Sequence, residues 1–304
     1  GKIEHRHFSD ITGYLRENDV LVLNDSKVFP ARLKVRKATG GQIDVLLVRP
    51  LGQGMWECLA RGIGGGRPAI PVTIGEYSAS IMRQNGSLAI SFASDGQAEE
   101  IIRTFGRMPL PPYIKRNGED GPEDFDRYQT VYARNTGSIA APTAGFHFSE
   151  ELLDAIRSMG VDVVTVTLHV GIGTFSLIHA DTLEEHRMHG EQYVLDDLSR
   201  TFLKEARSKG RRMVACGTSS VRTLETVFQA NGNALPAGKT ELFIYPGYTF
   251  RAVDALITNF HLPRSTPLML VAAFMGTDGL RKAYKEAVAG GYRFYSYGDA
   301  MFIS

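Results

Sequence analysis

The chain has 304 residues, with 43% hydrophobic residues, 22% charged residues and a formal net charge of +1. This balance is that of an ordinary globular protein of one large or two smaller domains, and it excludes a strongly basic protein that coats nucleic acid non-specifically. Two cysteines far apart, Cys58 and Cys216, exclude a disulfide framework and a cysteine-based structural zinc site, and they predict a reducing compartment.

A short apolar strand followed by a polar turn is the first predicted feature. Val20–Asn24 is predicted to be a strand, and Asp25, Lys27 and Arg32 follow close behind its end. These charges suit contacts with a substrate, although a capped turn with a solvated lysine accounts for them equally. No apolar run approaches the ~18 residues of a membrane-spanning helix, so we expect no membrane association.

Residues 31–108 are predicted to form short strands. Glycine-containing turns separate these strands, and Asn85 with Gly86 between two β-type runs indicates a hairpin. Strands of this length and spacing predict a small all-β barrel or sandwich. The predicted strands are Arg32–Arg36, Ile43–Val48, Trp56–Arg61, Ser78–Met82 and Leu88–Phe92.

Helices and strands alternate from Ser149 onward, which predicts an α/β domain. We expect an α/β catalytic domain formed by residues 1–30 and 109–304, with residues 31–108 inserted as a smaller all-β barrel domain. Residues 117–126 are expected to be an exposed loop. The helix Asp196–Lys209 is expected to turn Leu198, Phe202 and Ala206 inward. The other predicted elements are helices after Ser149 and Cys216, helices Thr266–Met275 and Asp278–Ala289, and strands Val161–Val170, Arg212–Cys216, Leu242–Tyr245 and Ala255–Phe260.

Small hydroxyl residues stand where the predicted strand ending at Cys216 turns into a helix. The backbone N–H groups of a helix start attract a carboxylate or phosphate, and Thr218 and Ser219 add hydroxyl donors, with Arg222 nearby. Strand-to-helix turns at this edge of an α/β sheet are favoured binding places. The segment therefore predicts an anion site, with an ordinary capped helix as the alternative.

A Gly-x-Gly turn follows the strand that ends at Leu168. His169 precedes Gly171 and Gly173, and Thr174 follows them. Glycines let a backbone approach a ligand closely, but the third glycine of a dinucleotide fingerprint is missing. A ligand contact and a simple tight turn both remain open.

Two further segments combine histidine with small, amide or aromatic residues. They contribute Thr143, Gly145, Phe146 and His147 at a helix entry, and Asn259 and His261 at the end of a buried strand. An aromatic ring can stack on a base, and a histidine can transfer protons. The alternatives are core anchors at the first segment and a polar turn at the second.

Histidines also gather between His169 and Glu191, with His179, His186 and His189 between them. This grouping invites a metal-dependent hydrolase as an alternative function. However, no His-Glu-x-x-His motif or four-residue histidine spacing is present. We therefore predict no bound metal.

Several long segments together resemble one enzyme family. They are LVLNDSKVFPARL, APTAGFHFSEELL, LHVGIGTF, HRMHGEQY, GTSSVRTLE, LITNFHLPRSTPLMLVAAFMG and YRFYSYGDAM. On these segments the chain resembles the S-adenosylmethionine:tRNA ribosyltransferase-isomerases of the queuosine pathway, from its first residues to its last. Family members usually begin with a further segment of a few dozen residues, so site residues from that segment cannot be assigned here.

The resemblance implies an α/β catalytic domain with a smaller all-β barrel domain, and a reaction without a metal. We expect the enzyme to be a cytoplasmic monomer. S-adenosylmethionine would be a co-substrate, with no permanently bound cofactor. The partner would be a tRNA with a GUN-type anticodon whose wobble base is already 7-aminomethyl-7-deazaguanine. The ribosyl unit would move to the aminomethyl nitrogen and isomerise, giving epoxyqueuosine-tRNA, adenine and methionine.

This chemistry needs a base for the acidic C5′ proton, help for the leaving adenine, an anion site for the methionine carboxylate and a place for the displaced wobble base. The resemblance makes residues of these segments candidates, and we predict their roles as follows: His169, His147, His261 and Asn259 in catalysis; Gly171, Gly173, Thr174, Thr218, Ser219 and Arg222 in binding S-adenosylmethionine; and Asp25, Lys27, Arg32, Thr143, Gly145 and Phe146 in binding the substrate, with Asp25, Lys27 and Arg32 contacting either the substrate or the anticodon phosphates. The general base is left open among the catalytic candidates.

The β-rich module has two open interpretations. Its cations suit tRNA phosphates, and a structural module with solvated charges is the alternative. The cations are Lys34, Arg36 and Lys37 along one predicted strand, and Arg61 and Arg67 beside a glycine-rich loop. A non-catalytic RNA-binding scaffold is the other alternative to a transferase, and it would turn over no S-adenosylmethionine.

Overall fold

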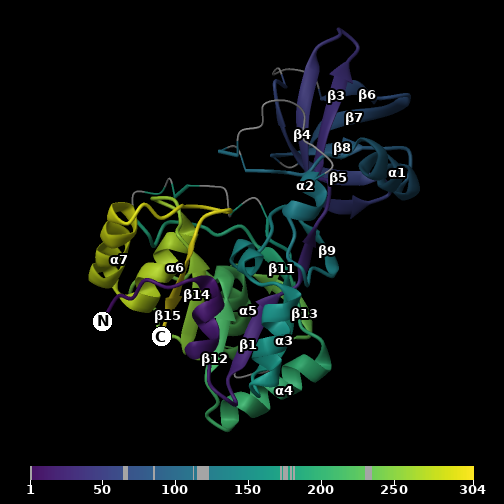
Figure 1. The fold of residues 1–304 in the computed structure, drawn as a ribbon. Helices are drawn as coiled ribbons and strands as arrows, with labels where there is room; N and C mark the ends of the chain where they lie inside the picture. The colour runs from purple at the N-terminus through teal and green to yellow at the C-terminus, as the bar shows by residue number, and fades with distance from the viewer. Residues whose placement is uncertain are drawn as a thin grey trace. The chain divides into compact units, whose positions relative to one another are not determined.

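The computed structural model describes residues 2–63, 68–84, 86–111, 113–114, 123–171, 173, 177–178, 180, 182–229 and 235–304. It divides into two compact units, Gly1–Lys27 with Gln129–Ser304, and Val28–Tyr128 (Figure 1). The predicted fold class, an α/β domain with an inserted β-barrel, is confirmed. In this division residues 109–128 group with the barrel strands, whereas the sequence analysis assigned them to the catalytic domain. The domain limits themselves remain a proposal.

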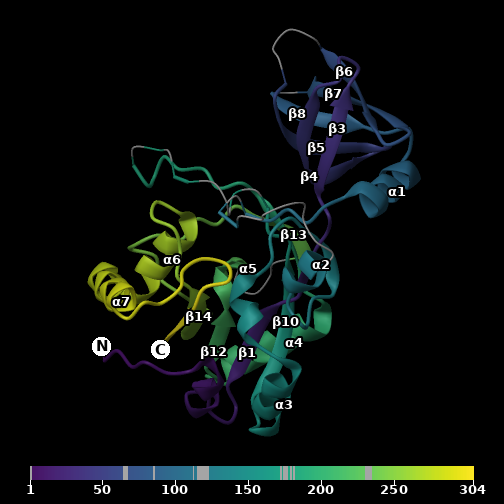
Figure 2. The same cartoon turned by 45° about the horizontal axis from the view of Figure 1, so that its top comes forward.

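The second unit is a closed antiparallel barrel with the strand order β3-β4-β5-β8-β7-β6 (Figure 2). The five strands expected from the sequence are present, and the sixth, β6, was not predicted. Helix α1 (Asp95–Phe105) was also missed, although Ser94 caps it by accepting a hydrogen bond from the Gln97 N–H group. The strands are β3 (Arg32–Lys37), β4 (Gln42–Gly52), β5 (Met55–Arg61), β6 (Ala69–Ile74), β7 (Tyr77–Gln84) and β8 (Ser87–Ser91).

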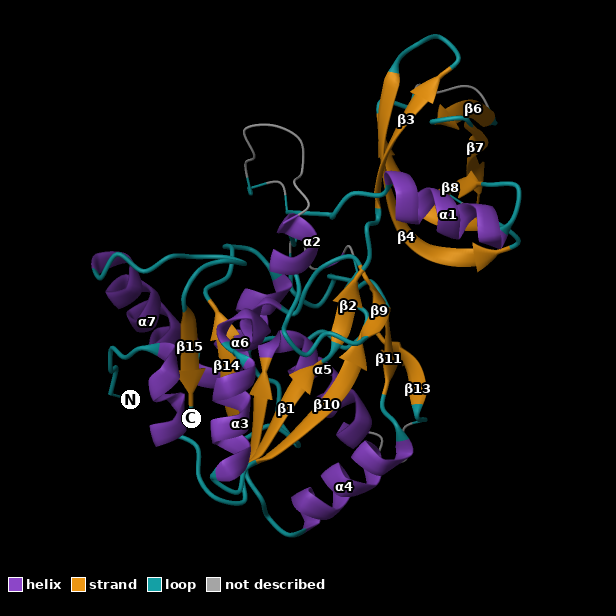
Figure 3. Cartoon of the chain, turned by 45° about the vertical axis from the view of Figure 1, so that its right-hand side comes forward, coloured by secondary structure: helices purple, strands orange, loops and turns teal. Residues whose placement is uncertain are grey.

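A seven-stranded sheet with the order β13-β11-β10-β1-β12-β14-β15 forms the centre of the first unit (Figure 3). The four middle strands, β1, β10, β12 and β14, are parallel, and the remaining pairings are antiparallel. The carboxyl ends of the parallel strands therefore lie at one edge. The bounds are β1 (Val20–Asn24), β10 (Asp162–Leu168), β11 (Glu191–Val194), β12 (Met213–Cys216), β13 (Ala237–Thr240), β14 (Ala255–Asn259) and β15 (Ala300–Ile303).

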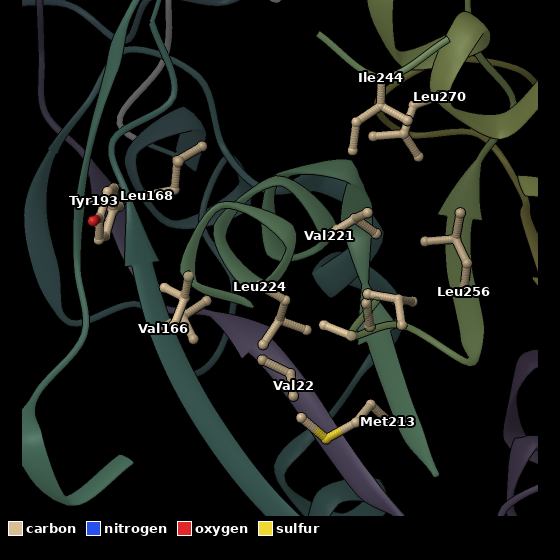
Figure 4. Packing of buried hydrophobic residues seen from close by; sticks show 14 of the residues in the cluster. Val22, Val166, Leu168, Tyr193, Met213, Val221, Leu224, Ile244, Leu256 and Leu270 are labelled. Carbon is tan, nitrogen blue, oxygen red and sulfur yellow. The ribbon is translucent and has the colours of Figure 1, made fainter. Parts of the chain in front are cut away.

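The central strand β1 is buried along its whole length because both faces of the sheet are covered. Its alternate residues point in opposite directions, so Val22 belongs to one core and Leu23 to the other. In the first core Val22 and Met213 lie below Val221 and Leu224 of helix α5 (Figure 4). The helices of this face are α4 (Asp197–Ser208), α5 (Gly217–Gln229), α6 (Thr266–Met275) and α7 (Thr277–Ala289).

The opposite face carries the short helices η1 (Phe8–Gly13) and η2 (Thr143–His147) and the helix α3 (Glu150–Ser158). The predicted helix start at Ser149 is confirmed, because its hydroxyl accepts a hydrogen bond from the Leu152 N–H group. A small two-stranded sheet pairs β2 (Ser26–Val28) with β9 (Asn135–Ser138). Within the residues that the structure describes, no helix is both long and apolar enough to span a membrane.

Three predictions of local structure were wrong. Residues 242–245 form no strand, because Leu242 gives its carbonyl group to Arg222 of α5 rather than to a sheet partner. Leu198 is 84% exposed, since it lies about 140° around the helix from the buried Leu203. The expected loop at residues 117–126 contains the start of helix α2 (Glu123–Arg127), and residues 117–122 lie outside the described part of the chain.

Candidate active site at the carboxyl edge of the sheet

Polar side chains follow each of the four parallel strands at their carboxyl ends. Asp25 follows β1, His169 follows β10, the segment from Gly217 follows β12, and Asn259 ends β14. The short helix η2 contacts both strand β14 and helix α5. The first residue of α5, Gly217, lies beside Ala144 of η2. The fold thus brings together candidates that lie far apart in the sequence.

Asp25 is 4% exposed and is held in place by hydrogen bonds from neutral groups. The Thr167 hydroxyl donates to its carboxylate at 2.6 Å, and the Asn135 amide donates to both of its oxygens at 3.1 Å. The Asn135 amide also lies 2.9 Å from the Thr167 hydroxyl oxygen. Asp25 was predicted from the sequence as a site residue, but Asn135 and Thr167 were not, because their positions beside it depend on the pairing of distant strands.

The backbone of His169 is held by a hydrogen bond, while one of its ring nitrogens has no hydrogen-bond partner among the described residues. Its N–H group donates to the Gln192 carbonyl at 2.9 Å. Its Nδ1 atom is buried and has no hydrogen-bond partner among the described residues. Burial lowers the pKa of His169, and the negative charge of Asp25 partly opposes that shift. The imidazole is therefore neutral at pH 7 and able to accept a proton.

Gly137 of β9 makes room for the His169 ring. A Cβ atom at this position would lie 2.7 Å from both Cε1 and Nδ1 of the imidazole. A Cβ atom essentially never makes non-bonded contacts shorter than about 3 Å, so only glycine allows the ring its observed place. This residue carries no chemistry of its own, and the sequence offered no sign of its role.

Arg222 is engaged inside the protein rather than left open for a ligand. It forms an ion pair with Glu191, and both side chains are at least nine-tenths buried. Its guanidinium also donates to the carbonyl groups of Leu242 and Thr240. Glu191 accepts a hydrogen bond from the Gly171 N–H group at 2.7 Å. The pair therefore ties helix α5 to the turn after β10, a role that sequence analysis missed.

The start of helix α5 keeps the features of an anion site. Gly217 has a φ of +84°, a left-handed conformation that lets the chain turn from β12 directly into the helix. Ser220 turns its hydroxyl to the Cys216 carbonyl at 2.6 Å. Thr218 is half-buried and Ser219 is 9% exposed. Among the described residues, no hydrogen bond occupies the hydroxyl of Thr218 or Ser219.

His147 and Asn259 meet above the carboxyl end of β14. The Asn259 amide lies 3.4 Å from the His147 Nε2 atom and donates to the Tyr295 carbonyl at 3.1 Å. The His147 ring stacks on Phe8, with 4.9 Å between ring centroids. Burial lowers the pKa of His147, so this ring is also neutral at pH 7. Asn259 and His147 are thus a second candidate pair for proton transfer or base recognition.

Three further candidates belong to η2, the short helix that ends at His147. Gly145 lies so close to the Tyr132 hydroxyl that a Cβ atom there would come within 2.0 Å of it. Phe146 stacks on Tyr297, with 5.6 Å between ring centroids, and Thr143 is half-buried at the start of the same helix. The candidate aromatic for base stacking therefore has an aromatic partner within the protein.

His261 points to a structural rather than a catalytic use. The Nε2 atom of its ring lies 2.7 Å from the Thr258 hydroxyl. Its backbone N–H group donates a hydrogen bond to the Tyr284 hydroxyl at 2.7 Å. Burial lowers the pKa of His261 to about 4. A ring with so low a pKa is a weak base at neutral pH.

The low pKa of His261 makes stability depend on pH. The His261 imidazole has a pKa of 6.5 in the unfolded chain and about 4 in the folded chain. The unfolded state therefore binds more protons between these two pH values, and the free energy of unfolding falls as the pH drops from 6.5 toward 4. A shift of this size corresponds to about 3 kcal/mol. We expect His261→Gln to lose less stability than the wild type between pH 7 and pH 5 in urea unfolding. The exposed His189→Gln is the control, and an equal loss in wild type and His261→Gln would contradict the assignment.

The remaining candidates lie elsewhere or outside the described residues. Lys27 is exposed near the end of β1. Arg32 belongs to the barrel unit, where it forms an ion pair with Asp44. Gly173 is buried against His189, and Thr174 lies outside the described part of the chain. In the portion that the structure describes, no three His, Cys, Asp or Glu side chains are grouped as metal ligands, and His179 lies outside it.

An α/β sheet whose carboxyl edge gathers imidazole, carboxylate and hydroxyl groups is the arrangement of an α/β enzyme. The comparisons with known proteins give the particular family. The chain belongs to the queuosine biosynthesis protein family, whose model matches residues 1–303. It is also similar to a solved S-adenosylmethionine tRNA ribosyltransferase from Thermotoga maritima. That protein is 37% identical over 100% of this chain and 88% of its own, with a TM-score of 0.52. The resemblance based on the sequence motifs is confirmed.

Proposed function

We propose that this enzyme transfers the ribosyl unit of S-adenosylmethionine to 7-aminomethyl-7-deazaguanine at the wobble position of tRNA and isomerises it. The products would be epoxyqueuosine-tRNA, adenine and methionine. Family membership and the 37% identical ribosyltransferase make the chain a transferase. The detailed reaction is our proposal, and the site geometry supports it.

The observation that carries the proposal is the imidazole of His169, which is neutral and has a ring nitrogen without a hydrogen-bond partner among the described residues. The sulfonium of S-adenosylmethionine acidifies the adjacent C5′ protons, so the first step needs a base beside the ribose. His169 lies at the carboxyl edge of the sheet, and its buried Nδ1 atom lacks a partner among the described residues. Asp25 stabilises the imidazolium that forms when the ring accepts the proton. We assign the base to His169.

The other candidates take supporting roles in this scheme. The turn containing Gly171 and Gly173 would lie along the ribose, because glycines let its backbone approach closely. His147 and Asn259 would hydrogen-bond the leaving adenine or the wobble base. His261 would support the end of β14 instead of transferring a proton.

The start of helix α5 would hold the methionine carboxylate. A helix N-terminus offers unpaired backbone N–H groups and favours negative charge. We expect Thr218→Ala with Ser219→Ala to raise the KM for S-adenosylmethionine about tenfold, since two hydroxyl donors are lost. The control is Ser220→Ala, whose hydroxyl faces the Cys216 carbonyl rather than the ligand. Unchanged steady-state constants in the double variant would remove the anion site from the scheme.

The proposal also covers the enzyme's location, its oligomeric state and the tRNAs on which it acts. We propose that the enzyme acts as a cytoplasmic monomer, without a resident cofactor or metal, on tRNAs with a GUN-type anticodon. The exposed Lys34 and Arg36 of β3 would contact tRNA phosphates. Neutralising both is expected to lower the slope of the logarithm of the tRNA binding constant against the logarithm of salt concentration by about two, and that result would support this contact.

The decisive test is mass spectrometry of the wobble nucleoside. Purified protein is mixed with S-adenosylmethionine and a tRNA carrying 7-aminomethyl-7-deazaguanine. Formation of epoxyqueuosine with equal amounts of adenine and methionine would establish the reaction. A folded protein that binds this tRNA but forms no product would favour the RNA-binding scaffold.

A further inference from the structure

Buried carboxylates in the α/β unit are generally matched by a cation or by backbone N–H groups. Asp19 pairs with Arg212 at 2.7 Å, and Glu191 pairs with Arg222. Glu225 is fully buried and accepts hydrogen bonds from three successive backbone N–H groups, residues 251–253, at 2.9–3.2 Å. These contacts offset the free energy lost when a charge leaves water.

Asp25 departs from this pattern. It is as buried as the others, at 4% exposure, yet among the described residues its carboxylate accepts hydrogen bonds only from the neutral side chains of Thr167 and Asn135. Lys27 is two residues away and Arg134 donates its backbone N–H group to the Asp25 carbonyl, but the side chains of both are exposed. Neither forms an ion pair with Asp25, nor does any other cation among the described residues.

Asp25 lies within the candidate active site. It follows β1 at the carboxyl edge, close enough for its charge to act on both His169 and Tyr132. The His169 Nδ1 atom is itself buried without a partner among the described residues. Incomplete polar groups of this kind are uncommon in folded proteins and call for a functional explanation.

We propose that the Asp25 carboxylate is the subsite for a cationic group of the substrates, an inference that rests on the proposed function. Two such cations take part in that reaction. One is the sulfonium of S-adenosylmethionine, and the other is the ammonium form of the aminomethyl group on the wobble base. Either would supply the counter-charge that no cation in the described part of the chain gives to Asp25. A carboxylate repels the anticodon phosphates, so Asp25 does not contact the RNA backbone.

The test compares each cationic ligand with a neutral counterpart by isothermal titration calorimetry. S-adenosylmethionine is compared with its thioether, S-adenosylhomocysteine. An anticodon stem-loop carrying 7-aminomethyl-7-deazaguanine is compared with one carrying the 7-hydroxymethyl base. The wild type is expected to prefer the cation in one pair, and Asp25→Asn to lower that preference about tenfold to hundredfold. Asp196→Asn makes the same charge change at an exposed helix cap and is expected to keep the wild-type preference.

The two pairs distinguish the two sources. Loss of preference between the small ligands identifies the sulfonium, and loss between the stem-loops identifies the ammonium. A wild type without preference in either pair, or an Asp25→Asn protein with both preferences intact, overturns the inference. The proposed function would still stand if the wobble-nucleoside assay gave product. A wild type that binds none of the four ligands contradicts the proposed function, and the inference with it.

Thermal unfolding without ligand separates this role from a structural one. Because no cation among the described residues pairs with Asp25, Asp25→Asn is expected to unfold at or above the wild-type temperature. A marked fall in unfolding temperature would show that the carboxylate holds the fold together, and it would count against the cation subsite.

Discussion

Replacing His169 with glutamine is expected to lower kcat about 10²- to 10⁴-fold, the range of a lost general base. Glutamine keeps a polar side chain of similar length but cannot accept a proton at neutral pH. The KM for S-adenosylmethionine should change little, since the lost interaction belongs to the transition state. Single-turnover assays of adenine release would measure the chemical step directly.

The pH profile gives an independent check of this assignment. Because burial lowers the pKa of His169 below its usual value, wild-type kcat/KM should rise with pH on the acid side and level off near neutrality. This rise should be lost in His169→Gln and kept in His189→Gln, which alters an exposed histidine after the same turn. Full activity of His169→Gln would exclude the residue as the base and direct attention to His147.

Gly137→Ala provides a companion variant that leaves His169 in place. Its Cβ atom would overlap the imidazole, so the ring must shift. A change of about 1 Å at a reacting group can reduce the rate roughly hundredfold. A fall in kcat with an unchanged fold would support a positioning role for the glycine.

The second large effect is expected when the buried ion pair is broken. Arg222→Met leaves Glu191 charged and buried without its partner, and such a change typically costs about 3–5 kcal/mol of stability. Urea unfolding of the ligand-free protein would measure the loss. The exposed pair of Lys209 with Glu205 is the comparison, because Lys209→Met should cost less than about 1 kcal/mol.

A double variant separates pairing from ligand binding. Arg222→Met with Glu191→Gln should recover part of the lost stability, because the unpaired charge is gone and the glutamine can still accept from Gly171. If Arg222→Met is as stable as the wild type but has a raised KM for S-adenosylmethionine, the arginine serves the ligand. That result would favour the role predicted from the sequence over the one inferred from its contacts.

Local patterns predicted the elements that depend on local physics. Helix α6 has the predicted bounds, because Ser265 caps it and a continuous apolar run follows. Strand β6 was missed because Pro71 interrupts its pattern, and proline is disfavoured within a sheet. Helix α1 could have been predicted, since Ser94 followed three residues later by Gln97 is a capping pattern.

The candidate site shows a similar division. Motifs at strand ends identified Asp25, His169 and Asn259, because parallel strands place their carboxyl ends together. The partners of these residues could not be found from the sequence. Glu191 reaches Gly171 and Arg222 because the antiparallel strand β11 lies beside β10, and Asn135 reaches Asp25 because β9 pairs with β2.

The interruption of the α/β unit by the barrel also has a consequence for synthesis on the ribosome. Every strand of the barrel lies between Arg32 and Ser91, so its pairings connect positions that emerge within a short interval. Strand β1 emerges before them but pairs with β10 and β12, which begin at Asp162 and Met213. Such distant contacts carry a large loop-closure entropy and form slowly. We therefore expect the barrel to fold during translation, while the apolar strand β1 stays unpaired until β10 and β12 have been synthesised. A chaperone that binds the nascent chain would then be needed most at β1.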